Sequence, residues 1–142
     1  MAGERLFLDA GFVVARFSPR DQYHQAARRV GGRLRDYREL WTTEAVLLEI
    51  SAALAAPGQR EIAVRIWDQF HGDPRCRLAA ISGALLDRAM ELFRHRSDKS
   101  WSLADCASFV LMSDHHLTDA LSCDHHFVQA GFRALLLEEN EG

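Results

Sequence analysis

The chain has 142 residues, of which 48% are hydrophobic and 26% are charged, and its net charge at pH 7 is −3. These values are typical of one globular domain with a buried core and exclude a disordered or fibrous chain. A pI near 6.1 also argues against broad electrostatic binding to nucleic acid, although five arginines crowd residues 28–38. Because no stretch has the length and apolarity of a membrane span and the N-terminus lacks a signal-peptide pattern, we expect a cytoplasmic protein.

Short apolar runs alternate along the chain with longer segments of helical periodicity. In chain order we predict a strand at 5–9, a helix at 19–37 with a candidate break at Gly31–Gly32, a strand at 40–43, helices at 43–56 and 59–71, a strand at 76–81, helices at 82–96 and 102–116, and strands at 119–123 and 134–137. This alternation indicates an α/β fold in a single domain over residues 1–142, with a mostly parallel central sheet and helices on both faces.

Carboxylates at two strand ends and on one apolar helix are the first candidate functional residues. Asp9 ends the first predicted strand and Asp124 follows the fourth, and open parallel sheets bind ligands beyond the carboxyl ends of their strands. Asp9 is equally suited to cap the next helix. Glu49 lies in the segment 45–56, whose only other polar side chain is Ser51. A carboxylate on so apolar a helix needs a cation, either a metal ion or an arginine from another helix.

Asp105 has a structural explanation as well as a functional one. The sequence Ser102-Leu103-Ala104-Asp105 before an apolar run predicts a capping box. The two roles are compatible, because a carboxylate at a helix N-terminus stays ionised and can still bind a cation. Asp124 is likewise able to cap a short helix that runs toward Gly131. Four gathered carboxylates repel one another, and hard divalent cations such as Mg²⁺ or Mn²⁺ relieve that repulsion.

Zinc is a weaker alternative to these hard cations. The three cysteines, Cys76, Cys106 and Cys123, form no CxxC motif, and the pairs His115-His116 and His125-His126 are adjacent residues that point in different directions. We therefore expect buried thiols rather than a zinc or disulfide framework.

The segments LFLDAG, TTEAVLLEISAAL, DKSWSLADCASFVLM and ALSCDHHFVQAGF follow one another along nearly the whole chain. Together they resemble the PIN-domain ribonucleases, especially the VapC-type toxins of bacterial toxin–antitoxin pairs. The resemblance implies a three-layer α/β/α PIN-like fold and Mg²⁺- or Mn²⁺-dependent hydrolysis of RNA phosphodiester bonds. It places the acidic catalytic and metal positions of the family on Asp9, Glu49, Asp105 and Asp124, and auxiliary positions on Ser122 and Asp98. Ala10 departs from the Thr or Ser that often follows the first Asp.

Several partners follow from this interpretation. We expect an RNA substrate with accessible unpaired strands, an antitoxin protein as a candidate partner, and no membrane. We also expect a homodimer, because the helices predicted at 43–56 and 59–71 carry more apolar surface than one face of a sheet covers. The alternative is a catalytically silent PIN-like interaction module, which metal-dependent cleavage would distinguish. An aspartyl-phosphate phosphatase is disfavoured, because Gly11 stands where that chemistry usually has a second acid.

Overall fold

The computed structural model describes residues 3–141, and its elements alternate between strands and helices. In chain order they are β1 (Arg5–Leu8), α1 (Ala10–Phe17), α2 (His24–Arg33), β2 (Glu39–Thr43), α3 (Glu44–Ala53), α4 (Arg60–Gly72), β3 (Cys76–Ala79), α5 (Gly83–His95), α6 (Leu103–Asp114), β4 (Asp119–Leu121), α7 (His125–Gln129), β5 (Arg133–Ala134) and α8 (Leu135–Glu141). Within the described residues, no helix combines the length and apolarity needed to cross a membrane.

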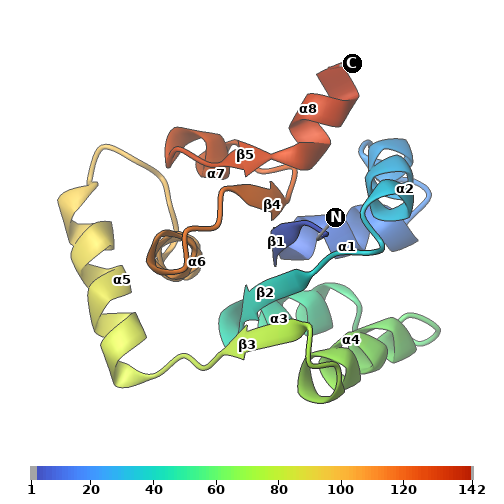
Figure 1. Ribbon diagram of the computed structural model, residues 1–142, viewed down its shortest axis with the longest axis horizontal. Coiled ribbons are helices and arrows are strands. Elements are labelled where there is room, and N and C mark those ends of the chain that lie inside the picture. The colour runs from blue at the N-terminus through green and yellow to red at the C-terminus, as the bar shows by residue number, and fades with distance from the viewer. Residues whose placement is uncertain (1–2, 142) are drawn as a thin grey trace.

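The five strands form one sheet in the order β3-β2-β1-β4-β5, and every neighbouring pair is parallel. Parallel neighbours require a crossover between strands, and each strand here is indeed followed by at least one helix. Helices α5 and α6 lie on one side of the sheet, whereas α1, α2 and α8 lie on the other (Figure 1). The predicted α/β architecture with helices on both faces is confirmed.

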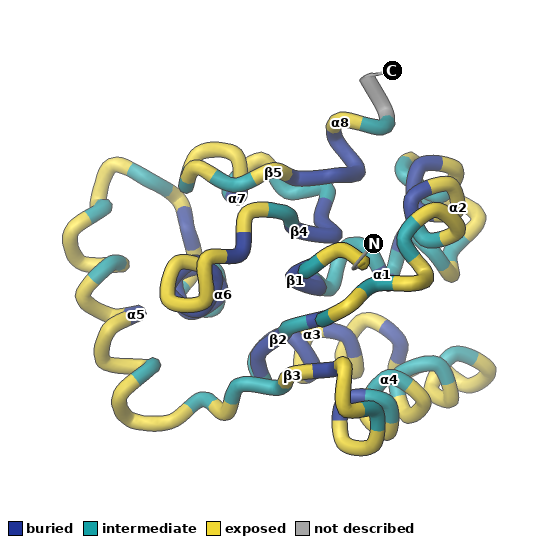
Figure 2. The backbone as a smooth tube through the Cα atoms, in the orientation of Figure 1, coloured by how far each residue is buried: buried dark blue, intermediate teal, exposed yellow. Residues whose placement is uncertain are grey.

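The core is built around the central strand and the helix α6. Leu6 and Phe7 of β1 are fully buried, and the Phe7 ring lies 6.0 Å from that of Phe127. Phe109 of α6 meets Phe127 edge to face at 5.0 Å. Residues 106–112 of α6 are all buried, because α5 covers the side of α6 that faces away from the sheet (Figure 2). A helix that is apolar on all sides requires such burial.

The first predicted helix is wrong at its start and at its break. Residues 18–23 form turns in which the Asp21 backbone N–H donates to Ser18 and the Asp21 carboxylate accepts from the Tyr23 N–H, so α2 begins only at His24. The helix then continues through Gly31–Gly32 to Arg33. A Cβ at Gly31 would lie at an ordinary van der Waals distance of 3.5 Å from the Phe12 ring, and one at Gly32 would meet open space, so neither glycine marks a break. Helix α1 occupies Ala10–Phe17, where the sequence pattern predicts no element.

The last predicted strand, at 134–137, is also wrong. Only Arg133–Ala134 pairs with β4, and α8 begins at Leu135. Leu135, Leu136 and Leu137 are all buried. A short run of buried leucines has the same appearance in a buried strand and in a buried helix. Helix α3 is shorter than predicted, since it ends at Ala53 rather than at 56.

Candidate active site

Four acidic residues meet in a cleft at the carboxyl ends of β1 and β4. These strands are neighbours with Leu8 opposite Leu121, so Asp9 and Ser122 leave the sheet side by side. The Asp9 N–H donates to the Leu121 carbonyl at 3.1 Å. The cleft has a volume of about 560 Å³ and is lined by Asp9, Ala10, Gly11, Glu49, Asp105, Cys123, Asp124, His125, His126 and Gln129. The fold therefore gathers all four predicted carboxylates, from α3, α6 and two strand ends.

Asp9 is held by a side-chain contact and not by a helix cap. The Ser122 hydroxyl donates to Asp9 Oδ2 at 2.7 Å and accepts from the Asp124 N–H at 3.0 Å. Although Asp9 precedes α1, its side chain makes no capping hydrogen bond, so the capping alternative is wrong. Burial raises the pKa of Asp9 to about 6; the bond from Ser122 opposes this, and the charges of Asp124 and Asp105 add to it.

Asp105 closes the predicted capping box, which is confirmed. Its N–H donates to the Ser102 hydroxyl and its Oδ2 accepts from the Ser102 N–H, both at 3.0 Å. The same Oδ2 lies 3.0 Å from Nδ1 of His126. One carboxylate thus fixes the start of α6 and also reaches the cleft, so the structural role does not remove Asp105 from the site.

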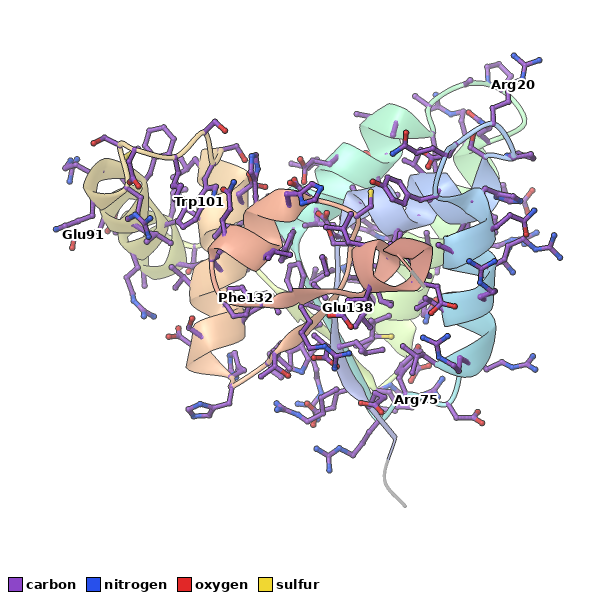
Figure 3. All side chains as sticks on the ribbon, turned by 90° about the horizontal axis from the view of Figure 1, so that it is seen from above. Arg20, Arg75, Glu91, Trp101, Phe132 and Glu138 are labelled. Atoms are coloured by element: carbon purple, nitrogen blue, oxygen red, sulfur yellow. The ribbon has the colours of Figure 1, made fainter. Side chains whose placement is uncertain are left out.

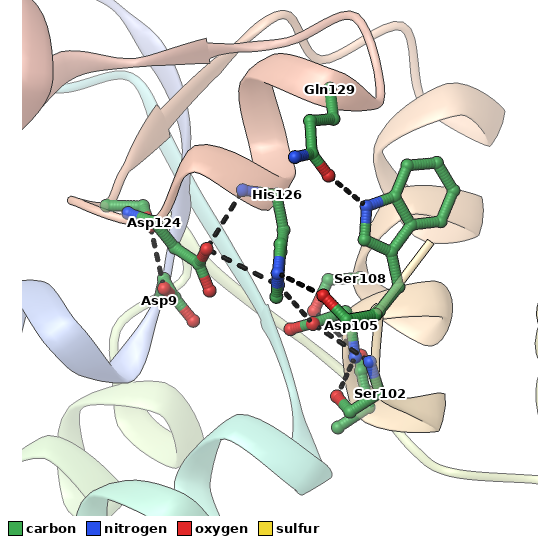
Figure 4. Close-up of polar contacts among 11 residues, drawn as sticks. Asp9, Ser102, Asp105, Ser108, Asp124, His126 and Gln129 are labelled. Atoms are coloured by element: carbon green, nitrogen blue, oxygen red, sulfur yellow. Dashed lines mark hydrogen bonds and ion pairs between the residues drawn. The ribbon is translucent and has the colours of Figure 1, made fainter. Parts of the chain in front are cut away.

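Asp124 is the predicted N-cap of the short helix α7, and this is confirmed by the bond from the His126 N–H to Asp124 Oδ1 at 2.9 Å. The His126 ring also lies between two carboxylates, with its Nδ1 3.4 Å from Asp124 Oδ1 (Figure 4). One ligand atom from each of Asp105, Asp124 and His126 lies within 4.8 Å of the others. The sequence indicates His126 only as a candidate zinc ligand, so its place between two carboxylates is a finding of the structure. Its position two residues after the predicted N-cap Asp124 could have indicated that the His126 ring lies near this carboxylate.

Glu49 lines the cleft from the exposed side of α3. The buried side of α3 consists of Val46, Leu47 and Ile50, whereas Glu49 is exposed at the mouth of the cleft. Glu49 is therefore exposed, although its helix is apolar, and no arginine from another helix pairs with it in the described chain. Partial desolvation raises its pKa to about 6, with further contributions from the charges of Asp9, Asp105 and Asp124.

The two auxiliary positions differ in their placement. Ser122 is buried and bonds Asp9 directly. The Asp98 side chain is 60% exposed, lies outside the cleft lining, and pairs with Arg96 at 3.0 Å and with Lys99 at 4.0 Å. Arg96 holds the pKa of Asp98 below its ordinary value. The structure does not bring Asp98 to the other acids.

The donors in the cleft fit a hard divalent cation. Within residues 3–141, none of the ion pairs links an arginine or lysine to Asp9, Glu49, Asp105 or Asp124. Desolvation and the neighbouring carboxylates raise the pKa values of Asp9 and Glu49, and a bound cation would stabilise their charged forms. The carboxylate oxygens of the cleft match the preference of Mg²⁺ and Mn²⁺ for oxygen ligands.

The fold and the site define an α/β protein with an open parallel sheet and an acidic cleft at the carboxyl ends of its strands. Comparison with known families identifies which family of this class the chain belongs to. The profile of the PIN domain matches residues 6–133, so the chain belongs to the PIN-domain family. The resemblance noted in the sequence is confirmed. No curated protein matches the chain significantly.

One similar solved structure is the crystal structure of VapC20 from Mycobacterium tuberculosis, described as a sarcin–ricin loop cleaving toxin. The two chains superimpose with a TM-score of 0.78 at 22% sequence identity, and the match covers 91% of this chain and 97% of that chain. At this identity the likeness establishes a common fold.

Proposed function

We propose that the protein is a Mg²⁺- or Mn²⁺-dependent endoribonuclease and the toxin of a toxin–antitoxin pair. The observation that carries the proposal is the convergence of four carboxylates, without an arginine or lysine partner in the described chain, at the carboxyl edge of the sheet. Family membership and the likeness in fold to a toxin that cleaves RNA support it. The alternative, a catalytically silent interaction module, does not explain why the fold holds four carboxylates together against their mutual repulsion.

Asp9, Asp105 and Asp124 would hold the metal ion, with Glu49 completing the set from α3. When bound, the ion supplies activation of water and neutralisation of charge on the phosphoryl oxygens. Ser122 fixes the orientation of Asp9 through its 2.7 Å bond, and the capping box fixes that of Asp105. These contacts preorganise the carboxylates, so little reorganisation accompanies the attack of water on the phosphodiester bond.

A second large hollow supports the antitoxin part of the proposal. We define the groove as this hollow of about 640 Å³, lined by Leu8, Phe12, Val13, Arg16, Phe17, Arg28, Gly31, Gly32, Leu34, Arg35, Tyr37, Leu40, Ile66, Gln69, Phe70, Arg75 and Leu121. It combines an apolar floor with four arginines and has no acidic lining residue. An amphipathic acidic segment of an antitoxin complements both properties.

A homodimer is the remaining part of the proposal. Helices α3 and α4 together leave an apolar surface at which Leu48 is 68% exposed, Val64 56% and Trp67 50%. A second copy of the chain would cover this surface. Light scattering at micromolar concentration should give the mass of two chains, and a stable monomer would contradict the dimer.

The test of the nuclease proposal is cleavage of single-stranded RNA by the purified protein in Mn²⁺. We expect Asp9→Asn to lower the cleavage rate by at least about a hundredfold while the protein stays folded, and EDTA to abolish cleavage by the wild type. Asp36→Asn is the matched control, since it removes the same charge at an exposed residue that lines neither the cleft nor the hollow beside α5, and it should leave the rate within about twofold. Full activity in EDTA, or equal losses in the two variants, would contradict the proposal.

A further inference from the structure

A third hollow lies between α5 and the segment that leads into α6. We define the α5 hollow as this space of about 390 Å³, lined by Met90, Phe93, Arg94, Arg96, Ser97 and Lys99. We propose that the α5 hollow binds the single RNA strand next to the scissile phosphate. In this arrangement Arg94 and Lys99 bind phosphates and Phe93 stacks on a base. The inference rests on the proposed ribonuclease function.

The charges of the α5 hollow suit a polyanion. Three of its six lining residues are cations, and none is acidic. Asp98, next to the hollow, pairs with Arg96 and approaches Lys99, whereas Arg94 takes part in no ion pair found within residues 3–141. Glu91 extends from the outer side of α5, away from Trp101 (Figure 3). A positive excess therefore remains in the hollow.

The acidic cleft makes such a surface necessary. Carboxylates repel the phosphate backbone, and most of the affinity of proteins for nucleic acid comes from cations that contact phosphates. Lys99 is the only lysine of the chain, and its side chain is 28% exposed. Cations close to the cleft can hold the strand without neutralising the carboxylates that would bind metal.

Helix α5 also presents apolar surface that the core does not use. It packs against α6 through the buried Ala89, while Leu86, Met90 and Phe93 form a stripe that is 39%, 37% and 44% exposed. Proteins that bind single strands without base pairing combine basic grooves with aromatic platforms on which bases stack. Phe93 beside Arg94 supplies this combination.

Direct contacts connect the α5 hollow to the acidic cleft. Ser100, the neighbour of Lys99, has its hydroxyl 3.3 Å from Nε2 of His126, and the Trp101 indole N–H donates to Gln129 at 2.9 Å. His126 and Gln129 both line the cleft. Residues 96, 97 and 99 line the α5 hollow, and the next two residues contact the cleft lining. The two spaces are therefore neighbours, and a strand that leaves the cleft past His126 would enter the α5 hollow.

The test measures RNA binding separately from cleavage. In an Asp9→Asn background, fluorescence anisotropy with a labelled single-stranded RNA gives Kd at several salt concentrations in Mn²⁺. Adding Arg94→Gln with Lys99→Gln should weaken binding at least about tenfold and reduce the slope of log K against log salt by about 1.4, or 0.7 for each lost phosphate contact. Phe93→Leu should weaken binding without changing the slope, because it removes stacking and no charge.

The matched control is Arg38→Gln with Arg77→Gln, which removes two exposed arginines at the amino ends of β2 and β3. It should change Kd by less than about twofold. Equal effects of the two double variants, or no binding of single-stranded RNA, would overturn the inference. Cleavage by proteins with Asp9 intact reports on the proposed function alone, so the two failures are distinguishable.

Discussion

The acidic cleft and the groove both include residues of α1, but their charges are opposite. The cleft takes Ala10 and Gly11 from the first turn and gathers four carboxylates, whereas the groove takes Phe12, Val13 and Arg16 and has four arginines. Neither surface is explained by the net charge of −3, which averages over both. One short helix therefore separates a surface suited to cations from a surface suited to an acidic partner.

The largest expected effect is that a divalent cation in the cleft raises the free energy of unfolding of the protein. Excess Mn²⁺ should stabilise the wild type by about 2.7 kcal/mol at a hundredfold excess over Kd, and Asp105→Asn by much less. If Asp105 only caps α6, its loss should instead cost about 0.5–1 kcal/mol with or without metal. Thermal melts of both proteins in EDTA and in Mn²⁺ decide between these roles, and equal metal-induced shifts would return Asp105 to a purely structural role.

A smaller effect is expected from reversing charge in the groove. Arg28→Glu with Arg35→Glu should weaken binding of an acidic amphipathic helical peptide at least about tenfold, because both arginines lie on the groove lining. RNA cleavage should stay within about twofold, since neither residue lines the cleft. The measurement is peptide anisotropy alongside the cleavage rate. Unchanged peptide affinity would contradict the proposal that the arginines of the groove bind an acidic partner.

The smallest effect is the pH dependence of stability in EDTA. The folded pKa values of Asp9 and Glu49 are about 6, above their ordinary values of 3.8 and 4.5. Between about pH 4 and 6 the folded protein therefore holds protons that the unfolded chain has released, and the contribution of these groups to stability falls as pH rises. The groove has no comparable group, because the pKa of Tyr37 is about 12.

Urea unfolding at several pH values measures this contribution. Asp9→Asn should gain stability relative to the wild type as pH rises from 4 to 7, because it lacks a carboxyl group that must ionise while buried. A constant difference between the two proteins over this range would contradict the raised pKa of Asp9.

The parts of the site that depend on local patterns could be predicted from the sequence. Asp9 and Asp124 follow predicted strands, and the rules for parallel sheets place such residues at one edge. The capping box of Asp105 follows from four adjacent residues. The central strands β1 and β2 were also predicted close to their observed positions, because their short apolar runs alternate with longer helical segments.

The parts that depend on tertiary contacts could not be predicted. The exposure of Glu49 depends on which side of α3 meets the core, and α3 is apolar on nearly every side. Likewise, α8 replaces a predicted strand because Leu135–Leu137 are buried as a helix against α2 and β4. His126 reaches Asp105 only because α7 and α6 pack together, 21 residues apart in the chain.

The central claim is that the cleft carboxylates together bind a divalent cation, and titration calorimetry with Mn²⁺ tests it most directly. We predict that the wild type and Asp98→Asn bind Mn²⁺ with the same affinity, because Asp98 lies outside the cleft. Asp9→Asn should bind it at least about tenfold more weakly, as expected when one carboxylate is lost from an acidic site. Equal affinity of Asp9→Asn and the wild type would contradict the claim.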